Sequence, residues 1–190
     1  MKTPAAPTVL RWPPSLYHQM ADLGWFRDKR VELIRGEIIV MSPMGSRHWV
    51  VVSLVGDALR ATYPQDEFVV AEQRPISVGG DSEPEPDLAV IRGRVRDFTD
   101  HLPKSCELVV EVSDSSLSYD RSVKADLYAE AGIPEYWIVD IIGRTVEVCT
   151  KPFSDESSAR FKERTTLSEH DLLVPLSAPN SSIRIVDLLP

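Results

Sequence analysis

The stretch ELVVEVSDSSLSYDRSVKADLYAEAGIPEYWIVD, residues 107–140, indicates a strand, a helix and a second strand in succession. Residues 107–112 are β-branched through their centre, which is typical of a strand. A loop then leads into a helix that ends at Gly132 and Pro134, because these two residue types stop helices. Residues 136–140 predict the next strand.

The neighbouring segments extend this order on both sides. Residues 31–41 predict two strands around the turn Arg35-Gly36, and residues 145–149 predict a hairpin partner for 136–140. Residues 47–62 have the period of an amphipathic helix, whose apolar face includes Trp49, Val52, Val55, Ala58 and Leu59. Further strands are expected at 68–72, 75–78 and 87–91, and weaker ones at 161–166, 172–176 and 183–186. This order predicts an α/β fold with a mixed central β-sheet flanked by helices.

Length and composition predict one domain over residues 1–190, because 190 residues with 43% hydrophobic content can bury a substantial core. Within it we expect a core at about 30–150, an irregular arm at 1–14 and a β-rich extension at 151–190 that starts with a polar loop. No apolar run approaches the roughly 20 residues of a membrane span, and the first ten residues lack the apolar region of a signal peptide. A cytoplasmic protein without a membrane partner is therefore expected. Cys106 and Cys149 are expected to be buried apolar residues.

The formal net charge is −8, which is unfavourable for a protein that binds a polyanion, since phosphate contacts depend on Lys and Arg. Residues 51–140 hold eight Lys and Arg against eighteen Asp and Glu. Bound cations at an acidic site in this region would offset part of the excess.

Two acids stand on neighbouring strand-like segments. Asp87 precedes the apolar run 88–91, and Glu111 lies inside the run 108–112. Burying carboxylates is costly unless a positive group lies beside them, so the pair predicts a divalent cation such as Mg²⁺. Asp120, Lys124 and Tyr128 recur every fourth residue, so on a helix they share one face and bring an ammonium to the acids. Two acids and a lysine meet the needs of phosphodiester hydrolysis.

Several separate blocks, in order, resemble the Uma2 family of predicted endonucleases, also called DUF820, in the PD-(D/E)xK restriction-endonuclease-like superfamily. The resemblance covers roughly residues 30–150. Its blocks are Glu32 to Glu37, Met41-Ser42-Pro43 with His48, Pro86-Asp87-Leu88, Leu108 to Ser113, Tyr119-Asp120 with Lys124, and Tyr128 to Asp140.

This resemblance implies that Asp87 and Glu111 are the metal-binding acids. The superfamily pattern has a lysine two residues after the second acid, but this chain has Ser113 at that position. The resemblance therefore points to a lysine displaced onto the following helix, and Lys124 fits that place. Glu37 and His48 match family positions and would complete the metal shell or contact the attacking water. The implied activity is a Mg²⁺-dependent endonuclease acting on DNA, with Mn²⁺ as a possible substitute, and the two strands of a duplex imply a homodimer.

Each strand acid and the lysine also has a purely structural interpretation. Asp87 would cap a turn or pair with Arg92, and Glu111 would face solvent on one side of its strand. Lys124 would be an exposed helix lysine paired with Asp120.

The remaining candidates have such interpretations too. Glu37 would be a hairpin acid beside the turn, and His48 a packed residue of the first helical turn. The cluster Arg92, Arg94 and Arg96 would hold phosphates or form a solvated face.

Two other functions compete with the nuclease. An interaction module that keeps the fold without cleavage would account for Ser113 and for the net charge. A glycoside hydrolase would use Asp87 and Glu111 as paired carboxylates, but it explains Lys124 poorly.

Overall fold

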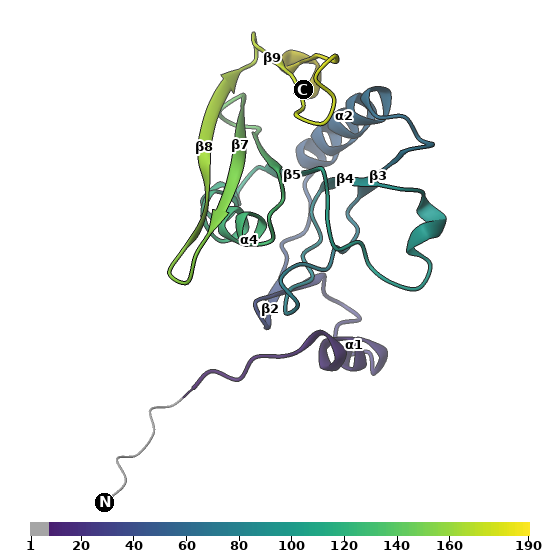
Figure 1. Cartoon of the computed structure of the whole chain (residues 1–190). Coiled ribbons are helices and arrows are strands. Elements are labelled where there is room, and N and C mark those ends of the chain that lie inside the picture. The colour runs from purple at the N-terminus through teal and green to yellow at the C-terminus, as the bar shows by residue number, and fades with distance from the viewer. Residues whose placement is uncertain (1–7) are drawn as a thin grey trace, which may run out of the picture.

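The computed structural model describes residues 8–190 and contains a six-stranded sheet in the order β3-β4-β5-β6-β7-β8. Every neighbouring pair is antiparallel except β5 and β6, which are parallel. The predicted α/β fold with a mixed central sheet is therefore confirmed (Figure 1). Its strands are β3 (Phe68–Glu72), β4 (Leu88–Arg92), β5 (Leu108–Ser113), β6 (Glu135–Asp140), β7 (Thr145–Ser154) and β8 (Ala159–Ser168).

The parallel pair arises from the helical crossover between β5 and β6, because parallel neighbours need a long connection. This crossover is a continuous helical stretch made of α3 (Leu117–Tyr119), the π-helical turn η2 (Asp120–Lys124) and α4 (Ala125–Glu130). It ends at Gly132, which has a φ of 71°. The strand, helix and strand predicted for residues 107–140 are all present.

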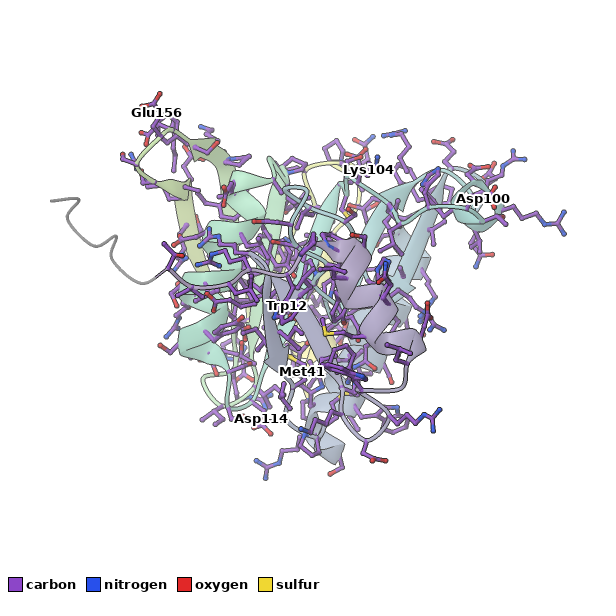
Figure 2. All side chains as sticks on the ribbon, turned by 90° about the horizontal axis from the view of Figure 1, so that it is seen from below. Trp12, Met41, Asp100, Lys104, Asp114 and Glu156 are labelled. Atoms are coloured by element: carbon purple, nitrogen blue, oxygen red, sulfur yellow. The ribbon has the colours of Figure 1, made fainter. Side chains whose placement is uncertain are left out.

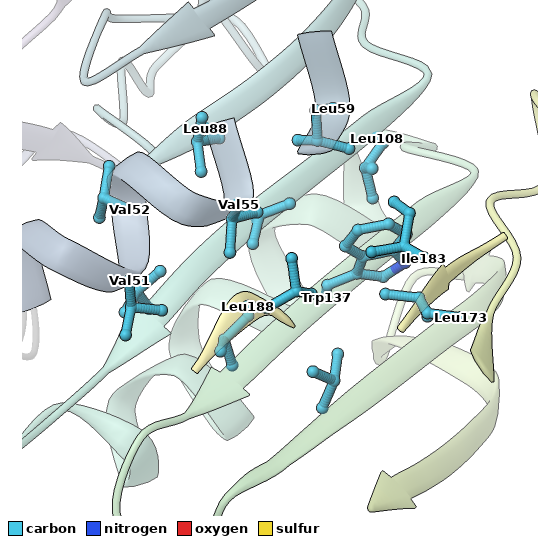
Figure 3. Close-up of a cluster of buried hydrophobic side chains, with 14 of the residues drawn as sticks. Val51, Val52, Val55, Leu59, Leu88, Leu108, Trp137, Leu173, Ile183 and Leu188 are labelled. Atoms are coloured by element: carbon cyan, nitrogen blue, oxygen red, sulfur yellow. The ribbon is translucent and has the colours of Figure 1, made fainter. Parts of the chain in front are cut away.

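One face of the sheet is covered by α2 (Ser46–Thr62) and by the C-terminal segment with β9 (Leu172–Leu173), β10 (Ile183–Arg184) and η3 (Ile185–Leu188). Trp137 of β6 lies at the centre of this core, between Val55 of α2 and Leu173 (Figure 3). Trp49 was predicted on the buried apolar face of this helix, but 61% of its surface is exposed. Val52, Val55 and Leu59 of the same predicted face are buried.

The opposite face is covered by α4, with Ala125, Leu127 and Tyr128 packed against sheet residues such as Ile138. Figure 1 shows α4 beside β7 and β8, away from α2. Both faces of β5 and β6 are thus buried, and every residue of these two strands is buried.

The N-terminal part contains α1 (Pro14–Asp22) and the hairpin β1 (Val31–Ile34) with β2 (Glu37–Val40), outside the main sheet. Residues 1–7 of the predicted arm lie outside the described residues, and residues 8–13 contain no helix or strand. The backbone N–H of Glu83 donates to the carbonyl of Leu33 over 2.7 Å, and this bond joins the hairpin to the segment that precedes β4.

Two predictions at the level of elements are wrong. Residues 151–160 are not a polar loop: β7 and β8 form a hairpin of ten residues each, whose turn is held by Asp155 Oδ1 accepting from the N–H groups of Ser157 and Ser158 over 2.9 Å. Residues 75–78 form no strand, and only an isolated bridge links Val78 to Ser82. A short 3-10 helix, η1 (Val95–Phe98), follows β4.

In the described range 8–190, no helix has the length and apolar character needed to cross a membrane. Cys106 and Cys149 are free and buried. The assignment of the chain to one domain stays a prediction.

Candidate active site

A cleft of about 300 Å³ opens beside the ends of β4 and β5. One wall is formed by residues 39–45 and His48, and the other by residues 111–112 and 114–116 with Tyr119, Asp120 and Lys124. Figure 2 shows Met41 and Asp114, one from each wall, at the same end of the molecule, remote from Asp100 and from Glu156 at the tip of the β7–β8 hairpin.

The register of the sheet brings the two predicted acids together. Leu88 pairs with Val110 in an antiparallel ladder, so the next positions along, Asp87 and Glu111, lie opposite one another. Asp87 Oδ2 accepts a 2.8 Å hydrogen bond from the backbone N–H of Val112, and the N–H of Asp87 lies 3.4 Å from Glu111 Oε2. Both acids line the cleft.

Glu111 is almost completely buried, with 6% of its residue surface exposed. Its Oε1 accepts from Lys124 Nζ over 2.9 Å and from the Tyr128 hydroxyl over 2.7 Å. Burial raises the pKa of Glu111 to about 8, and the negative charge of Asp87 also raises it. The positive charge of Lys124 lowers this pKa but does not outweigh the burial. The interpretation of Glu111 as a solvent-facing strand residue is wrong, because β5 is covered on both faces.

Lys124 joins Glu111 to a second buried acid. Its Nζ lies 3.0 Å from Oε1 and 2.8 Å from Oε2 of Glu32, in addition to its bond to Glu111. Burial lowers the pKa of Lys124, but the negative charges of Glu111 and Glu32 outweigh it and the net shift is upward. Lys124 is 1% exposed, so its interpretation as a surface lysine paired with Asp120 is wrong.

Asp120 lies on the same buried face of the helix and is held by hydroxyl groups. Its Oδ2 accepts from Ser113 and from Ser116, each over 2.6 Å. The π-helical turn, which starts at Asp120, is wider than an α-helical turn, and such turns are frequent at functional sites. Asp120 and Lys124 both line the cleft. Ser113, where the resemblance led us to look for a lysine, thus donates a hydrogen bond to an acid.

Glu32 was not singled out from the sequence, although it is fully buried at the centre of β1. Burial raises its pKa, and the ammonium of Lys124 acts against this. The available signal was its place inside the strand Val31–Ile34, where an acid among apolar residues needs a cation.

Glu37, which was predicted for the site, lies elsewhere. It is at the start of β2 beside the turn, its side chain is half exposed, and it pairs with Arg11 over 3.0 Å. It does not line the cleft. The prediction that Glu37 belongs to the site is not supported. Glu37 lies at the turn end of the hairpin, whereas residues 39–41, toward the other end, form part of the cleft wall.

His48, in the first turn of α2, does reach the site. Its Nε2 lies 3.1 Å from Asp87 Oδ2. Burial lowers the pKa of His48, but the hydrogen bond to Asp87 and the charge of Asp87 raise it more, so the net shift is upward. His48 therefore holds Asp87 from the α2 side.

A comparison with known families agrees with this geometry. The model of the Uma2 family, described as "Putative restriction endonuclease", matches residues 14–183. The chain belongs to the Uma2 family. The resemblance expected for residues 30–150 is thus confirmed over a longer range.

A solved structure described as a "putative nuclease belonging to DUF820", from Anabaena variabilis ATCC 29413, is similar to this Uma2 chain with a TM-score of 0.64 and 18% sequence identity. The match covers 85% of this chain and 90% of that chain, and it shows a shared fold. No curated protein matches the sequence.

The arginine cluster of this Uma2 chain does not contribute to the cleft. Arg92 ends β4, whereas Asp87 precedes its first residue, so a strand of five residues at about 3.3 Å each separates them. Arg92 Nε donates to Glu107 over 3.0 Å, and Arg94 Nε donates to the Asp66 carbonyl over 3.3 Å. The predicted pair between Asp87 and Arg92 is therefore absent.

The donor set of the Uma2 site fits a hydrated divalent cation. In residues 8–190 no group of three or more His, Cys, Asp or Glu is placed around one position. Within residues 8–190, Asp87 Oδ1 and Glu111 Oε2 each accept a single hydrogen bond, of 3.4 Å, and so keep free acceptor capacity. Mg²⁺ usually takes one or two protein carboxylates and fills its shell with water and substrate phosphate, so two such oxygens suffice.

Proposed function

We propose that this Uma2 protein is a Mg²⁺-dependent endonuclease that hydrolyses phosphodiester bonds of DNA. One observation carries the proposal: a buried lysine is bonded to Glu111, whose second oxygen lies beside Asp87 at an open cleft. The description of the family as restriction endonucleases and the nuclease description of the similar structure support it.

Asp87 and Glu111 would hold Mg²⁺, or Mn²⁺ in its place. When bound, the ion would supply a Lewis acid for the phosphoryl oxygens and lower the pKa of a coordinated water. Neither acid needs to move for this role, since one oxygen of each is free of short hydrogen bonds.

Lys124 provides the fixed positive charge of the site. Its ammonium is held by two carboxylates and is therefore oriented before substrate arrives, which lowers the reorganisation needed when negative charge builds up on the phosphoryl group. Tyr128 fixes the other side of Glu111, and His48 fixes Asp87. A glycoside hydrolase has no use for the bond between Lys124 and Glu111, so the nuclease explains the arrangement better.

The decisive comparison is Asp87→Asn, which keeps the shape of the side chain and removes its charge. The control is Asp100→Asn, because Asp100 is exposed and lies away from the cleft (Figure 2). Supercoiled plasmid and circular single-stranded DNA are incubated with each protein and Mg²⁺, and Mg²⁺ binding is measured by calorimetry on the same samples.

We expect the wild type and Asp100→Asn to bind Mg²⁺ and cut DNA. Asp87→Asn should lose Mg²⁺ binding, and its activity should fall by at least roughly 10- to 100-fold. That is the loss seen when a residue that only supports a metal ligand is mutated, and a ligand itself should matter no less. Failure of the wild type to bind Mg²⁺ and to cut either DNA, with DNA affinity retained, would favour the interaction module instead.

A further inference from the structure

The register of the sheet extends the row of site residues to a third strand. Glu72, the last residue of β3, pairs with Leu88, so the next positions along, Gln73 and Asp87, lie opposite one another. Asp87 lies opposite Glu111 in the same way on its other side. The backbone N–H of Gln73 donates to the carbonyl of Asp87 over 3.1 Å, which continues the ladder one step past the end of β3.

The side-chain amide of Gln73 contacts the oxygen of Asp87 that has free acceptor capacity. Its Nε2 donates to Asp87 Oδ1 over 3.4 Å and to the sulfur of Met44, in the cleft wall, over 2.9 Å. In the described part of the chain this is the single hydrogen bond that Oδ1 accepts. The other oxygen, Oδ2, accepts from the N–H of Val112 and lies 3.1 Å from His48 Nε2. Both oxygens of the carboxylate are therefore held.

Gln73 has an unfavourable backbone conformation, with a φ of 49° in the left-handed region. Among the described residues, three other non-glycine residues have a positive φ. Arg35 and Arg144 lie in hairpin turns, and Lys151 lies inside the β7–β8 hairpin. Gln73 instead directly follows the edge strand β3, beside Asp87. Such conformations persist where surrounding contacts hold them, and they cluster at active sites.

We propose that Gln73 is a positioning residue for the Asp87 carboxylate: its amide fixes the rotation of this carboxylate and so holds Oδ1 ready for Mg²⁺. The inference rests on the proposed nuclease function and adds a residue to its site. A carboxylate oxygen has two lone pairs, so it can accept from one donor and still bind a cation. An amide suits this role because it donates without adding a positive charge that would repel the ion.

Two variants separate the amide from the backbone. Gln73→Gly removes the side chain, accepts a φ of 49° without strain, and keeps the N–H that binds the carbonyl of Asp87. Gln73→Glu keeps the length of the side chain but replaces its N–H donors by an acceptor. The control is Lys151→Gly, which also removes a side chain at a positive φ, here 57°. Lys151 does not line the cleft, and its ion pair with Glu163 is exposed.

Three quantities are measured on each protein: Mg²⁺ affinity by calorimetry without DNA, kcat and KM for plasmid nicking near the wild-type Kd for Mg²⁺, and the urea midpoint in chelator. We expect both Gln73 variants to bind Mg²⁺ roughly 10- to 100-fold more weakly and to lose kcat, with little change in KM. Lys151→Gly should match the wild type in Mg²⁺ affinity and kcat.

The urea midpoint distinguishes positioning from a structural role. In chelator, Gln73→Gly should unfold at no lower urea concentration than the wild type, because glycine relieves the left-handed conformation. A purely structural Gln73 would give the reverse pattern, a lower midpoint with unchanged Mg²⁺ affinity.

Wild-type Mg²⁺ affinity in Gln73→Gly would overturn the inference, and normal nicking by the wild type would leave the nuclease intact. Tighter Mg²⁺ binding by Gln73→Glu would also overturn it, since an oxygen rather than a donor would then be needed at this position. If the wild type binds Mg²⁺ but cuts no plasmid, the proposed nuclease fails, and calorimetry still decides the role of Gln73. A wild type that binds neither Mg²⁺ nor Mn²⁺ would overturn both.

Discussion

Three buried charges define the site at the scale of residues. Glu32 and Glu111 contribute two negative charges when ionised, and Lys124 contributes one positive charge between them. A net negative charge in a buried place is unfavourable, so the cluster tends to bind a proton. This explains why burial raises the pKa of both acids although a lysine lies within 3.0 Å.

The first prediction concerns the pH dependence of stability. The pKa of Glu111 rises from 4.5 to about 8 on folding, so between these values the folded protein holds a proton that the unfolded chain releases. The free energy of unfolding should therefore fall as pH rises through this window, and Glu111→Gln should flatten that fall. Urea unfolding in chelator at about pH 5.5 and about pH 8 measures it, with exposed Glu37→Gln as the control. An unchanged slope in Glu111→Gln would contradict the buried titration.

The second prediction concerns Glu32. Glu32→Gln keeps the side-chain volume but leaves Lys124 with one carboxylate, so the ammonium should be oriented less firmly. We expect kcat on DNA to fall by roughly 10- to 100-fold with little change in KM, as for residues that position a reactive group. Steady-state kinetics check this, and Glu37→Gln should behave as the wild type. A change confined to KM would instead place Glu32 in substrate binding.

At the scale of elements, the hairpin of β1 and β2 carries Glu32 to Lys124, and the conformation of its turn determines whether it does so. Arg35 and Gly36 have φ of 48° and 73°, the left-handed conformation that a two-residue hairpin turn needs. A Cβ on Gly36 would lie 2.7 Å from Arg11 Cβ. Glycine is therefore required there for two reasons, backbone conformation and space.

The third prediction separates these reasons. Gly132 has a similar φ of 71°, but a Cβ there would meet nothing within 4 Å. Gly132→Ala should lower the free energy of unfolding by about 1–2 kcal/mol, the cost of the left-handed conformation. Gly36→Ala should lower it further because of the contact with Arg11. Urea unfolding of both variants checks the order, and equal losses would show that the contact relaxes without cost.

The sequence pattern of the helical crossover predicted which residues share a face, but not the π-helical turn. The spacing of Asp120, Lys124 and Tyr128 predicted one shared face, and all three are buried. The π-helical turn between the first two was not predicted, because spacings of four residues fit α-helical and wider turns alike. Packing against β5 and the hairpin decides between them.

At the scale of the whole molecule, a homodimer stays a prediction that rests on the family resemblance and on the two-fold symmetry of duplex DNA. Light scattering after size exclusion should give twice the 21.3 kDa of the chain. A monomer would remove the argument from duplex symmetry.

The elements were predicted where hydrophobic periodicity is strong, as in residues 47–62 and 107–140. Prediction failed at residues 151–160, which were expected to form a loop, whereas the strands expected at 145–149 and 161–166 lie in β7 and β8. None of residues 151–160 is buried, so no pattern of buried apolar residues marks them as strand. Asp87 and Glu111 were singled out from the sequence because charge inside or beside an apolar strand is a local anomaly. Lys124 was singled out from its helical spacing with Asp120 and from the family resemblance. Glu37 was chosen over Glu32 although the two lie in one hairpin, because local sequence does not say which of them faces a buried lysine.

Most of the order of strands and helices and the family could be established from the amino-acid sequence, because both depend on residue types and spacings along the chain. The tertiary structure was needed to show that Glu32 binds Lys124, and that Glu37 and the arginine cluster lie away from the cleft. The physical reason is that these facts depend on contacts between segments far apart in sequence: Lys124 meets Glu32 across 92 residues, and the antiparallel register of β4 and β5 sets Asp87 against Glu111.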